Sequence, residues 1–142
     1  MPTNDEYESL KAQRRNAQAK YNATLGRIEE CEYKISRLKR TKATLTEQKR
    51  SFASIKKDDK TIVDQKRRSA WSGSCFSSFR LFGAALIDTN EGFYRNSLDG
   101  ALDAVNDEIT RLENQKYNEY GLLGRLSSTI NSLANKIENF FN

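Results

Sequence analysis

Histidine is absent from this chain of 142 residues, and its single proline stands at position 2. The chain therefore lacks the commonest general base and the commonest zinc ligand of proteins. Its carboxylates fall in runs such as NDEITRLE, which are typical of solvated helix faces. We expect no enzyme, no metal site and no cofactor. Because no Pro/Gly-rich linker follows Pro2, we expect one domain over residues 1–142.

Cysteines and long apolar runs are also scarce. Cys31 and Cys75 are far apart and show no CxxC spacing. Cys31 falls on an apolar stripe, which favours a buried thiol, and a Cys31–Cys75 disulfide is the open alternative. No segment approaches the ~20 apolar residues of a membrane span, and the polar, acidic start MPTNDEYESL does not resemble a signal peptide. We expect a cytoplasmic protein without a membrane span.

The first half of the chain repeats apolar residues in alternating steps of three and four, which is the seam of a coiled coil. Thr3 and Glu6 have the spacing of a capping box just before this seam, so a first arm is predicted over about residues 4–67. Basic residues on the seam can lay their stems along it and keep their charge in water. The seam positions are Tyr7, Leu10, Arg14, Ala17, Tyr21, Thr24, Ile28, Cys31, Ile35, Leu38, Lys42, Leu45, Lys49 and Phe52.

A second seam with the same spacing runs through the C-terminal half. Its phase continues across Gly121 and Gly124, which predicts an uninterrupted helix. Asp88 and Glu91 have capping-box spacing and suggest that the second arm covers residues 88–141. The seam positions are Leu98, Leu102, Val105, Ile109, Leu112, Lys116, Glu119, Leu123, Leu126, Ile130, Leu133, Ile137 and Phe140.

Two long seams without strand-like alternation predict an all-α fold, a long antiparallel helical hairpin of coiled-coil type. Charge favours the pairing of the two arms. Residues 1–68 hold 18 Lys/Arg and 10 Asp/Glu, whereas residues 69–142 hold 6 and 9.

The middle section, residues 68–87, is rich in aromatic residues and poor in charge. Gly73 can adopt the positive φ that turns a chain after a helix, and Phe76, Phe79 and Phe82 are three residues apart. We expect a turn at Trp71-Ser72-Gly73 followed by a short aromatic-rich helix. These aromatics either close the end of the hairpin or form an exposed surface that docks a partner, and the two interpretations are compatible.

The W-x-G turn of Trp71 and Gly73 resembles the WXG-type helical hairpins of the type VII (ESX-like) secretion systems of Gram-positive bacteria. The resemblance is closer to the YwqH-like α-helical proteins that are associated with LXG-type polymorphic toxins. It also rests on the segments ALDAVNDEITRLENQ and KYNEYGLLGRLSSTINSLANKIENFF, and it spans most of the chain. A Y-x-x-x-D/E export signal has no match, because the residue at the fourth position after Tyr94 is leucine.

This resemblance implies a non-catalytic, chaperone-like protein without a small-molecule substrate. It would bind the helical N-terminal domain of an LXG-type toxin, together with a second small helical protein, and present it to the secretion machinery. Export would then need no signal peptide. The candidate partner-binding residues are Trp71, Gly73, Phe76, Phe79 and Phe82. Candidates for a seam that faces the partner are Lys42 and Lys49, which are poor core residues, and Gly121 and Gly124, which let a helix approach closely.

The alternative function is a basic coiled coil that binds nucleic acid. Residues 37–68 contain 12 Lys/Arg and 4 Asp/Glu, and the sequence pI is 9.2. A basic stripe is the electrostatic footprint of phosphate binding. This stretch has only Phe52 for base stacking and contains no recognition motif, so a solvated helix face, or a face that pairs with an acidic partner, is the favoured interpretation.

Overall fold

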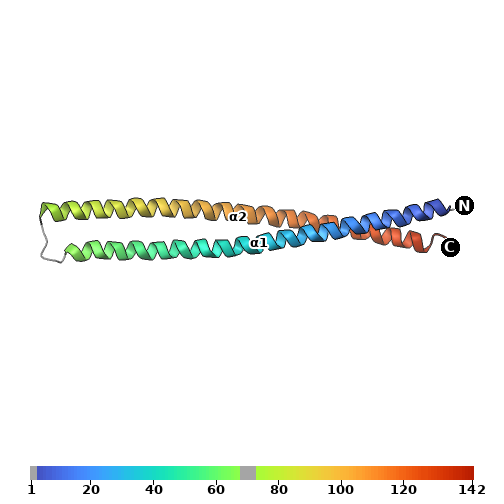
Figure 1. The fold of residues 1–142 in the computed structure, drawn as a ribbon, viewed down its shortest axis with the longest axis horizontal. Helices are drawn as coiled ribbons and strands as arrows, with labels where there is room; N and C mark the ends of the chain where they lie inside the picture. Colours follow the sequence, from blue (N-terminus) through green and yellow to red (C-terminus); the bar gives the residue numbers. More distant parts are fainter. Residues whose placement is uncertain (1–2, 68–72) are drawn as a thin grey trace. The chain divides into compact units, whose positions relative to one another are not determined.

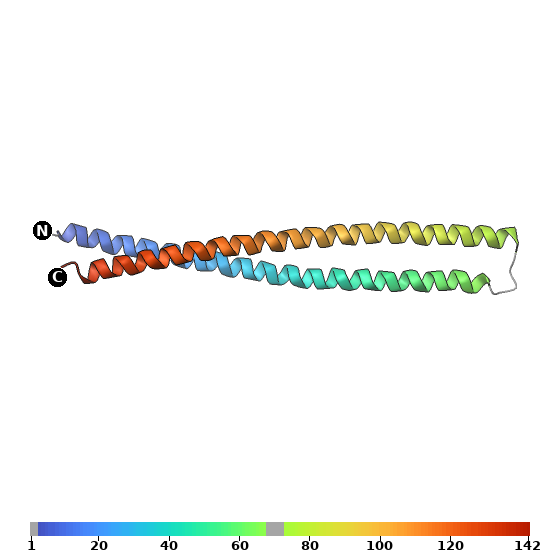
Figure 2. The same cartoon turned by 180° about the vertical axis from the view of Figure 1, so that it is seen from behind.

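The computed structural model describes residues 3–67 and 73–142, with side-chain environments given except at residues 62–67 and 76. The described chain consists of two long α-helices that pack against each other, and it contains no strand (Figures 1 and 2). Helix α1 spans Asn4–Arg67 and helix α2 spans Ser74–Glu138. Within the described residues, neither helix has a stretch that is long and apolar enough to cross a bilayer. The expected all-helical hairpin is confirmed at this level.

The start of α1 confirms the predicted capping box. The backbone N–H of Thr3 donates to Glu6 Oε2 at 2.9 Å, and the backbone N–H of Glu6 donates to Thr3 Oγ1 at 3.2 Å. These two bonds satisfy amide groups that lack a partner within the helix. The Tyr7 amide then donates to the Thr3 carbonyl at 3.2 Å, so the helix begins at the residue that the motif indicates.

The predicted start of the second arm at Asp88 is wrong, because α2 begins at Ser74. Gly73 has φ 103°, and its carbonyl accepts the Ser77 amide at 3.0 Å. No proline interrupts the chain after this point, so the aromatic segment forms the first turns of α2 and not a separate short helix. Asp88 and Glu91 lie inside α2, where their carboxylates pair with lysines of α1.

The residues divide into two compact units, of which unit 1 contains Met1–Arg37 and Ile109–Asn142. The helices run antiparallel in unit 1, because Tyr7 lies against Phe140 with ring centroids 5.4 Å apart while Arg27 Nε lies 3.0 Å from Glu119 Oε1. All buried residues in the described part of this unit occupy seam positions. They are Ala17, Thr24, Ile28, Cys31 and Ile35 of α1 and Ile109, Leu112 and Leu133 of α2. The predicted seam is therefore confirmed in unit 1.

Thr24 and Cys31 show how unit 1 accommodates its less apolar seam residues. Thr24 is 0% exposed, and its hydroxyl donates to the Lys20 carbonyl at 2.8 Å and accepts from Arg27 Nη2 at 3.0 Å. A buried hydroxyl with both bonds made carries little desolvation penalty. Cys31 is buried as predicted, and both it and Cys75 are free thiols, which removes the disulfide alternative.

Unit 2 contains Leu38–Glu108 and has a different interior. None of its described side chains is buried, although Leu38, Leu45, Phe52, Leu98, Leu102 and Val105 are half-buried along the predicted seam. Phe52 of α1 lies against Tyr94 of α2 with ring centroids 4.7 Å apart. The seam of unit 2 is therefore in place, but it is open to solvent along its length.

The difference between the two interiors predicts that replacing a seam leucine by alanine lowers the unfolding free energy more in unit 1 than in unit 2. Leu112 is 2% exposed in unit 1, so Leu112→Ala leaves a cavity and should lower the unfolding free energy by about 2–5 kcal/mol. Leu102→Ala in unit 2 removes a half-buried side chain and should cost clearly less. Urea unfolding followed by circular dichroism measures both. Equal losses of unfolding free energy would show that the seam of unit 2 excludes solvent as completely as that of unit 1.

Candidate interaction surface

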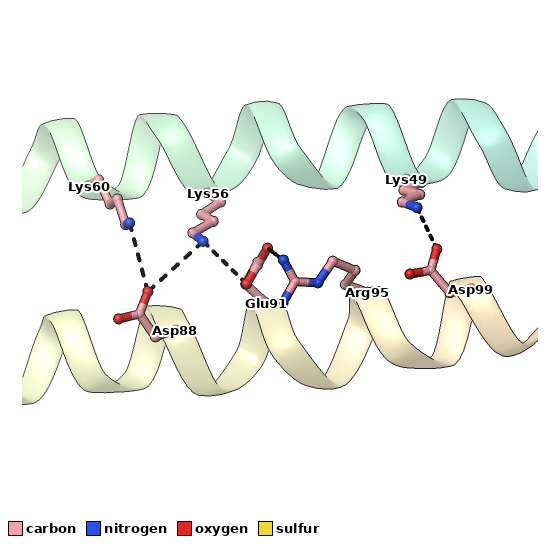
Figure 3. Close-up of polar contacts among 7 residues, drawn as sticks. All are labelled: Lys49, Lys56, Lys60, Asp88, Glu91, Arg95 and Asp99. Atoms are coloured by element: carbon pink, nitrogen blue, oxygen red, sulfur yellow. Dashed lines mark hydrogen bonds and ion pairs between the residues drawn. The ribbon is translucent and has the colours of Figure 1, made fainter.

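Ion pairs connect the two helices along one side of unit 2 (Figure 3). Lys56 Nζ lies 3.2 Å from Glu91 Oε2 and 4.0 Å from Asp88 Oδ1, and Lys60 Nζ lies 3.7 Å from Asp88 Oδ1. Lys49 pairs with Asp99 about two turns further along α2. Together these pairs hold α1 against α2 where the apolar seam is thin.

A small hollow lies on the same side of unit 2. Phe52, Ala53 and Leu98 supply its apolar lining, and Lys49, Glu91 and Arg95 supply its charged groups. Arg95 Nη1 also lies 3.2 Å from Glu91 Oε1, so two of the charged lining residues pair with each other (Figure 3). We refer to this side of unit 2 as the ion-paired side.

The other side of α2 in unit 2 carries exposed apolar side chains at helical spacing. Phe82, Leu86 and Phe93, here called the aromatic stripe, are 70%, 49% and 67% exposed. Separations of four and seven residues place the three on one face of the helix. An exposed, aligned set of this kind on a helix that already packs through another face is typical of a binding surface.

The residues directly before and after each seam residue of α2 show that the ion-paired side and the side of the aromatic stripe are distinct. Ile87 is half-buried, with Leu86 before it and Asp88 after it. Tyr94 packs on Phe52, with Phe93 before it and Arg95 after it. Because consecutive residues differ by about 100° around a helix, the residues before and after a seam position lie on opposite flanks. The ion pairs and the aromatic stripe are thus separated by the seam.

The predicted partner-binding residues near the turn are only partly within the described structure. Trp71 lies outside the described residues, as does the side chain of Phe76. Gly73 has the expected positive φ and stands directly before α2. Phe79 and Phe82 are both exposed in the first turns of α2, at 39% and 70%. Phe82 is therefore the predicted aromatic residue that is most accessible among those described.

The four candidates for a partner-facing seam fall into different units. Lys42 and Lys49 belong to unit 2, and Gly121 and Gly124 belong to unit 1. Lys42 is exposed, whereas Lys49 has a carboxylate partner within the chain in Asp99. Gly121 and Gly124 are exposed inside the continuous helix α2, and a Cβ added to either would meet no atom within 4 Å. The prediction that α2 continues through both glycines is confirmed.

Sequence reasoning missed Leu86 and Phe93 as members of the exposed surface. Both lie on the helix face of Phe82, since a step of four residues stays on one face and a step of seven repeats a heptad position. Leu86 belongs to the predicted middle section, whose candidates were its aromatic residues, whereas Phe93 lies beyond the predicted helix boundary at Asp88. The lysine partners of Asp88 and Glu91 were missed for the same reason, because these carboxylates were interpreted as a helix cap.

The chain matches no protein-family model, no curated protein and no solved structure.

The ion-paired side predicts a salt-dependent contribution to stability. Glu91→Gln removes the carboxylate that faces both Lys56 and Arg95 and should lower the unfolding free energy by about 1 kcal/mol at low ionic strength. The loss should shrink as added salt screens the charges. Urea unfolding at two salt concentrations measures it. Glu47→Gln is the control, because Glu47 Oε2 lies 3.1 Å from Arg50 Nη1 of its own helix. A loss that salt does not change would contradict an electrostatic origin.

Two glycines inside α2 and the glycine directly before it predict stability changes of opposite sign. Gly121→Ala and Gly124→Ala add a methyl group into open space within a helix, and each should raise the unfolding free energy by about 1 kcal/mol. Gly73→Ala should lower it by about 1 kcal/mol or more, because φ 103° strains any residue with a Cβ. Thermal unfolding distinguishes the two groups. Destabilisation by Gly121→Ala would show that another group already packs against that position.

Proposed function

We propose that the protein is a non-catalytic, chaperone-like partner that adds its two helices to a bundle with helical segments of another protein. The proposed partner is the helical N-terminal domain of an LXG-type toxin exported by a type VII system, with a second small helical protein as a further component. The observation that supports this proposal is the aromatic stripe, Phe82, Leu86 and Phe93, exposed on a helix that already packs through another face.

The spacing of the stripe indicates what kind of group fits it. Positions separated by four and seven residues match the interdigitating side chains of a second α-helix. Base stacking on single-stranded nucleic acid uses aromatic residues beside a basic groove, and the paired lysines lie on the other side of the seam from the stripe. A helical protein segment is therefore the partner that the stripe favours over nucleic acid.

The interior of unit 2 supports the same proposal. A helical pair without a buried side chain among its described residues gains little from hydrophobic burial, and exposed ion pairs contribute only about 0–1 kcal/mol each. An additional helix that covers Phe82 and Phe93 supplies the missing burial. The resemblance of Trp71 and Gly73 to WXG-type hairpins then suggests which class of protein brings that helix.

The proposal predicts that co-purification with an LXG-type toxin N-terminal domain depends on the stripe. Phe93→Ala should weaken recovery of the co-expressed toxin domain by roughly tenfold or more, as expected for an exposed aromatic anchor. Tyr117→Ala is the matched control, because Tyr117 is also an exposed aromatic residue of α2 but lies in unit 1. Affinity capture of tagged protein with quantified prey measures both.

Each outcome of this capture is informative. Unchanged recovery with Phe93→Ala contradicts the stripe as the binding surface. Capture from native cells that recovers nucleic acid removable by salt, and no protein partner, favours the basic stretch of residues 37–68 and overturns the adaptor proposal.

A further inference from the structure

Unit 1 contains a polar layer within its apolar seam. Thr24 of α1 is 0% exposed, and the side chain of Glu119, which occupies a seam position of α2, is 17% exposed. Arg27 connects the two, because its Nη2 donates to Thr24 Oγ1 at 3.0 Å and its Nε donates to Glu119 Oε1 at 3.0 Å. The planar guanidinium thus joins both helices through two of its donors. We refer to Thr24, Arg27 and Glu119 as the polar layer.

The polar layer is not the arrangement that would stabilise unit 1 most. Glu119 Oε2 is buried and has no hydrogen-bond partner among the described residues. An acceptor that leaves water without gaining a partner opposes folding, and an apolar side chain of similar size at such a position is often equally or more stabilising. The next seam position, Leu123, is apolar. Stability alone therefore does not explain why a glutamate stands at position 119.

The neighbouring heptads of α1 repeat the polar layer only in part. One heptad before its two α1 residues stand Ala17 and Lys20, and one heptad after them stand Cys31 and Lys34. Displacing the helices by one heptad keeps the seams opposite each other and brings Glu119 beside one of these lysines. A lysine lacks the planar fork that bonds two acceptors at once, and neither alanine nor a thiol replaces the hydroxyl as an acceptor. The complete layer therefore forms in one register.

We propose that the polar layer fixes the register of α1 against α2 in unit 1. A seam that repeats every seven residues gives registers that differ by one heptad similar apolar burial, so a further contact has to distinguish them. The contact of hydroxyl, guanidinium and carboxylate does so, at the expense of some stability. The inference goes beyond the proposed function, since it uses no residue of the aromatic stripe.

Two pairs of introduced cysteines report the register. Tyr7 lies against Phe140, so Leu10, three residues further along α1, lies opposite Ile137 of the antiparallel helix. After a displacement by one heptad, Leu10 lies opposite Ile130, which precedes Ile137 by seven residues. Leu10, Ile130 and Ile137 are all half-buried seam residues, so the two pairs are matched.

Disulfide formation distinguishes the two pairs. Leu10→Cys with Ile137→Cys reports the natural register, and Leu10→Cys with Ile130→Cys reports the displaced one, because a disulfide forms only where the Cα atoms lie within about 7 Å. Cys75→Ser removes the exposed natural thiol from both reporters, and Cys31 is buried. Mild oxidation of the full chain followed by mass spectrometry then measures the yield of each disulfide.

Moving the polar layer by one heptad tests the inference directly. Ala17→Thr, Lys20→Arg, Thr24→Ala and Arg27→Lys exchange the residues of two heptads and leave composition and net charge unchanged. In the natural layer, the disulfide at position 137 should exceed that at position 130 by about tenfold or more, and the exchange should reverse this ratio. A disulfide that stays at position 137 after the exchange would show that other contacts set the register, which overturns the inference.

Glu119→Leu keeps the test decisive if circular dichroism shows that the exchanged chain has lost its helices. It removes the carboxylate from the layer, so the urea midpoint should rise while the two disulfides form to similar extents. Lys116→Leu is the matched control, because Lys116 is a half-buried charged residue at the preceding seam position. It should also raise the midpoint but leave the disulfide at position 137 dominant. An unchanged disulfide ratio in Glu119→Leu, or a lowered midpoint, overturns the inference.

Discussion

The rest of the structure depends on one interaction, the burial between α1 and α2 of seam side chains that are spaced alternately three and four residues apart. In unit 1 this burial includes residues such as Ile28, Cys31 and Leu112, and even the polar Thr24 is fully enclosed with its hydroxyl bonds made. In unit 2 the same spacing includes Lys49 and continues four residues beyond Phe52 to Lys56, and the ammonium groups of both lysines must remain near water or near carboxylates. One sequence period therefore produces two interiors with different physical chemistry.

The lysines of unit 2 determine where its carboxylates must lie. Asp88 and Glu91 lie about one turn apart on α2, and Asp99 lies about two turns beyond Glu91. Each of the three carboxylates therefore meets a lysine of the antiparallel helix. Pairs of this kind align the helices but contribute little free energy when solvent reaches them. The alignment leaves Phe82, Leu86 and Phe93 without cover within unit 2, because the seam faces α1 and the charges occupy the adjoining flank.

Much of the fold could be predicted from the sequence, since a heptad period and a capping box are local signals. Three such predictions are confirmed: the capping box of Thr3 and Glu6, the buried seam of unit 1, and the continuity of α2 across Gly121. The same capping rule failed at Asp88, because acidic residues three apart serve equally as ion-pair partners, and only the position of Lys56 and Lys60 on the other helix decides between the two roles. The candidate surface was predicted at Phe79 and Phe82 but not at Phe93, since exposure depends on which flank the partner helix leaves open.

The one-sided distribution of charge in unit 2 is itself an argument for an interface. Stability of the hairpin alone gives no reason to keep charge from the flank of α2 that carries Phe82, Leu86 and Phe93, because exposed flanks tolerate either sign at little cost. A charge on that flank becomes costly only when another surface removes it from water, where the penalty reaches several kcal/mol per ion. The absence of charge from this flank of α2 therefore supports the proposed contact outside the hairpin, and the helical spacing of Phe82, Leu86 and Phe93 fits a helix as the contacting element.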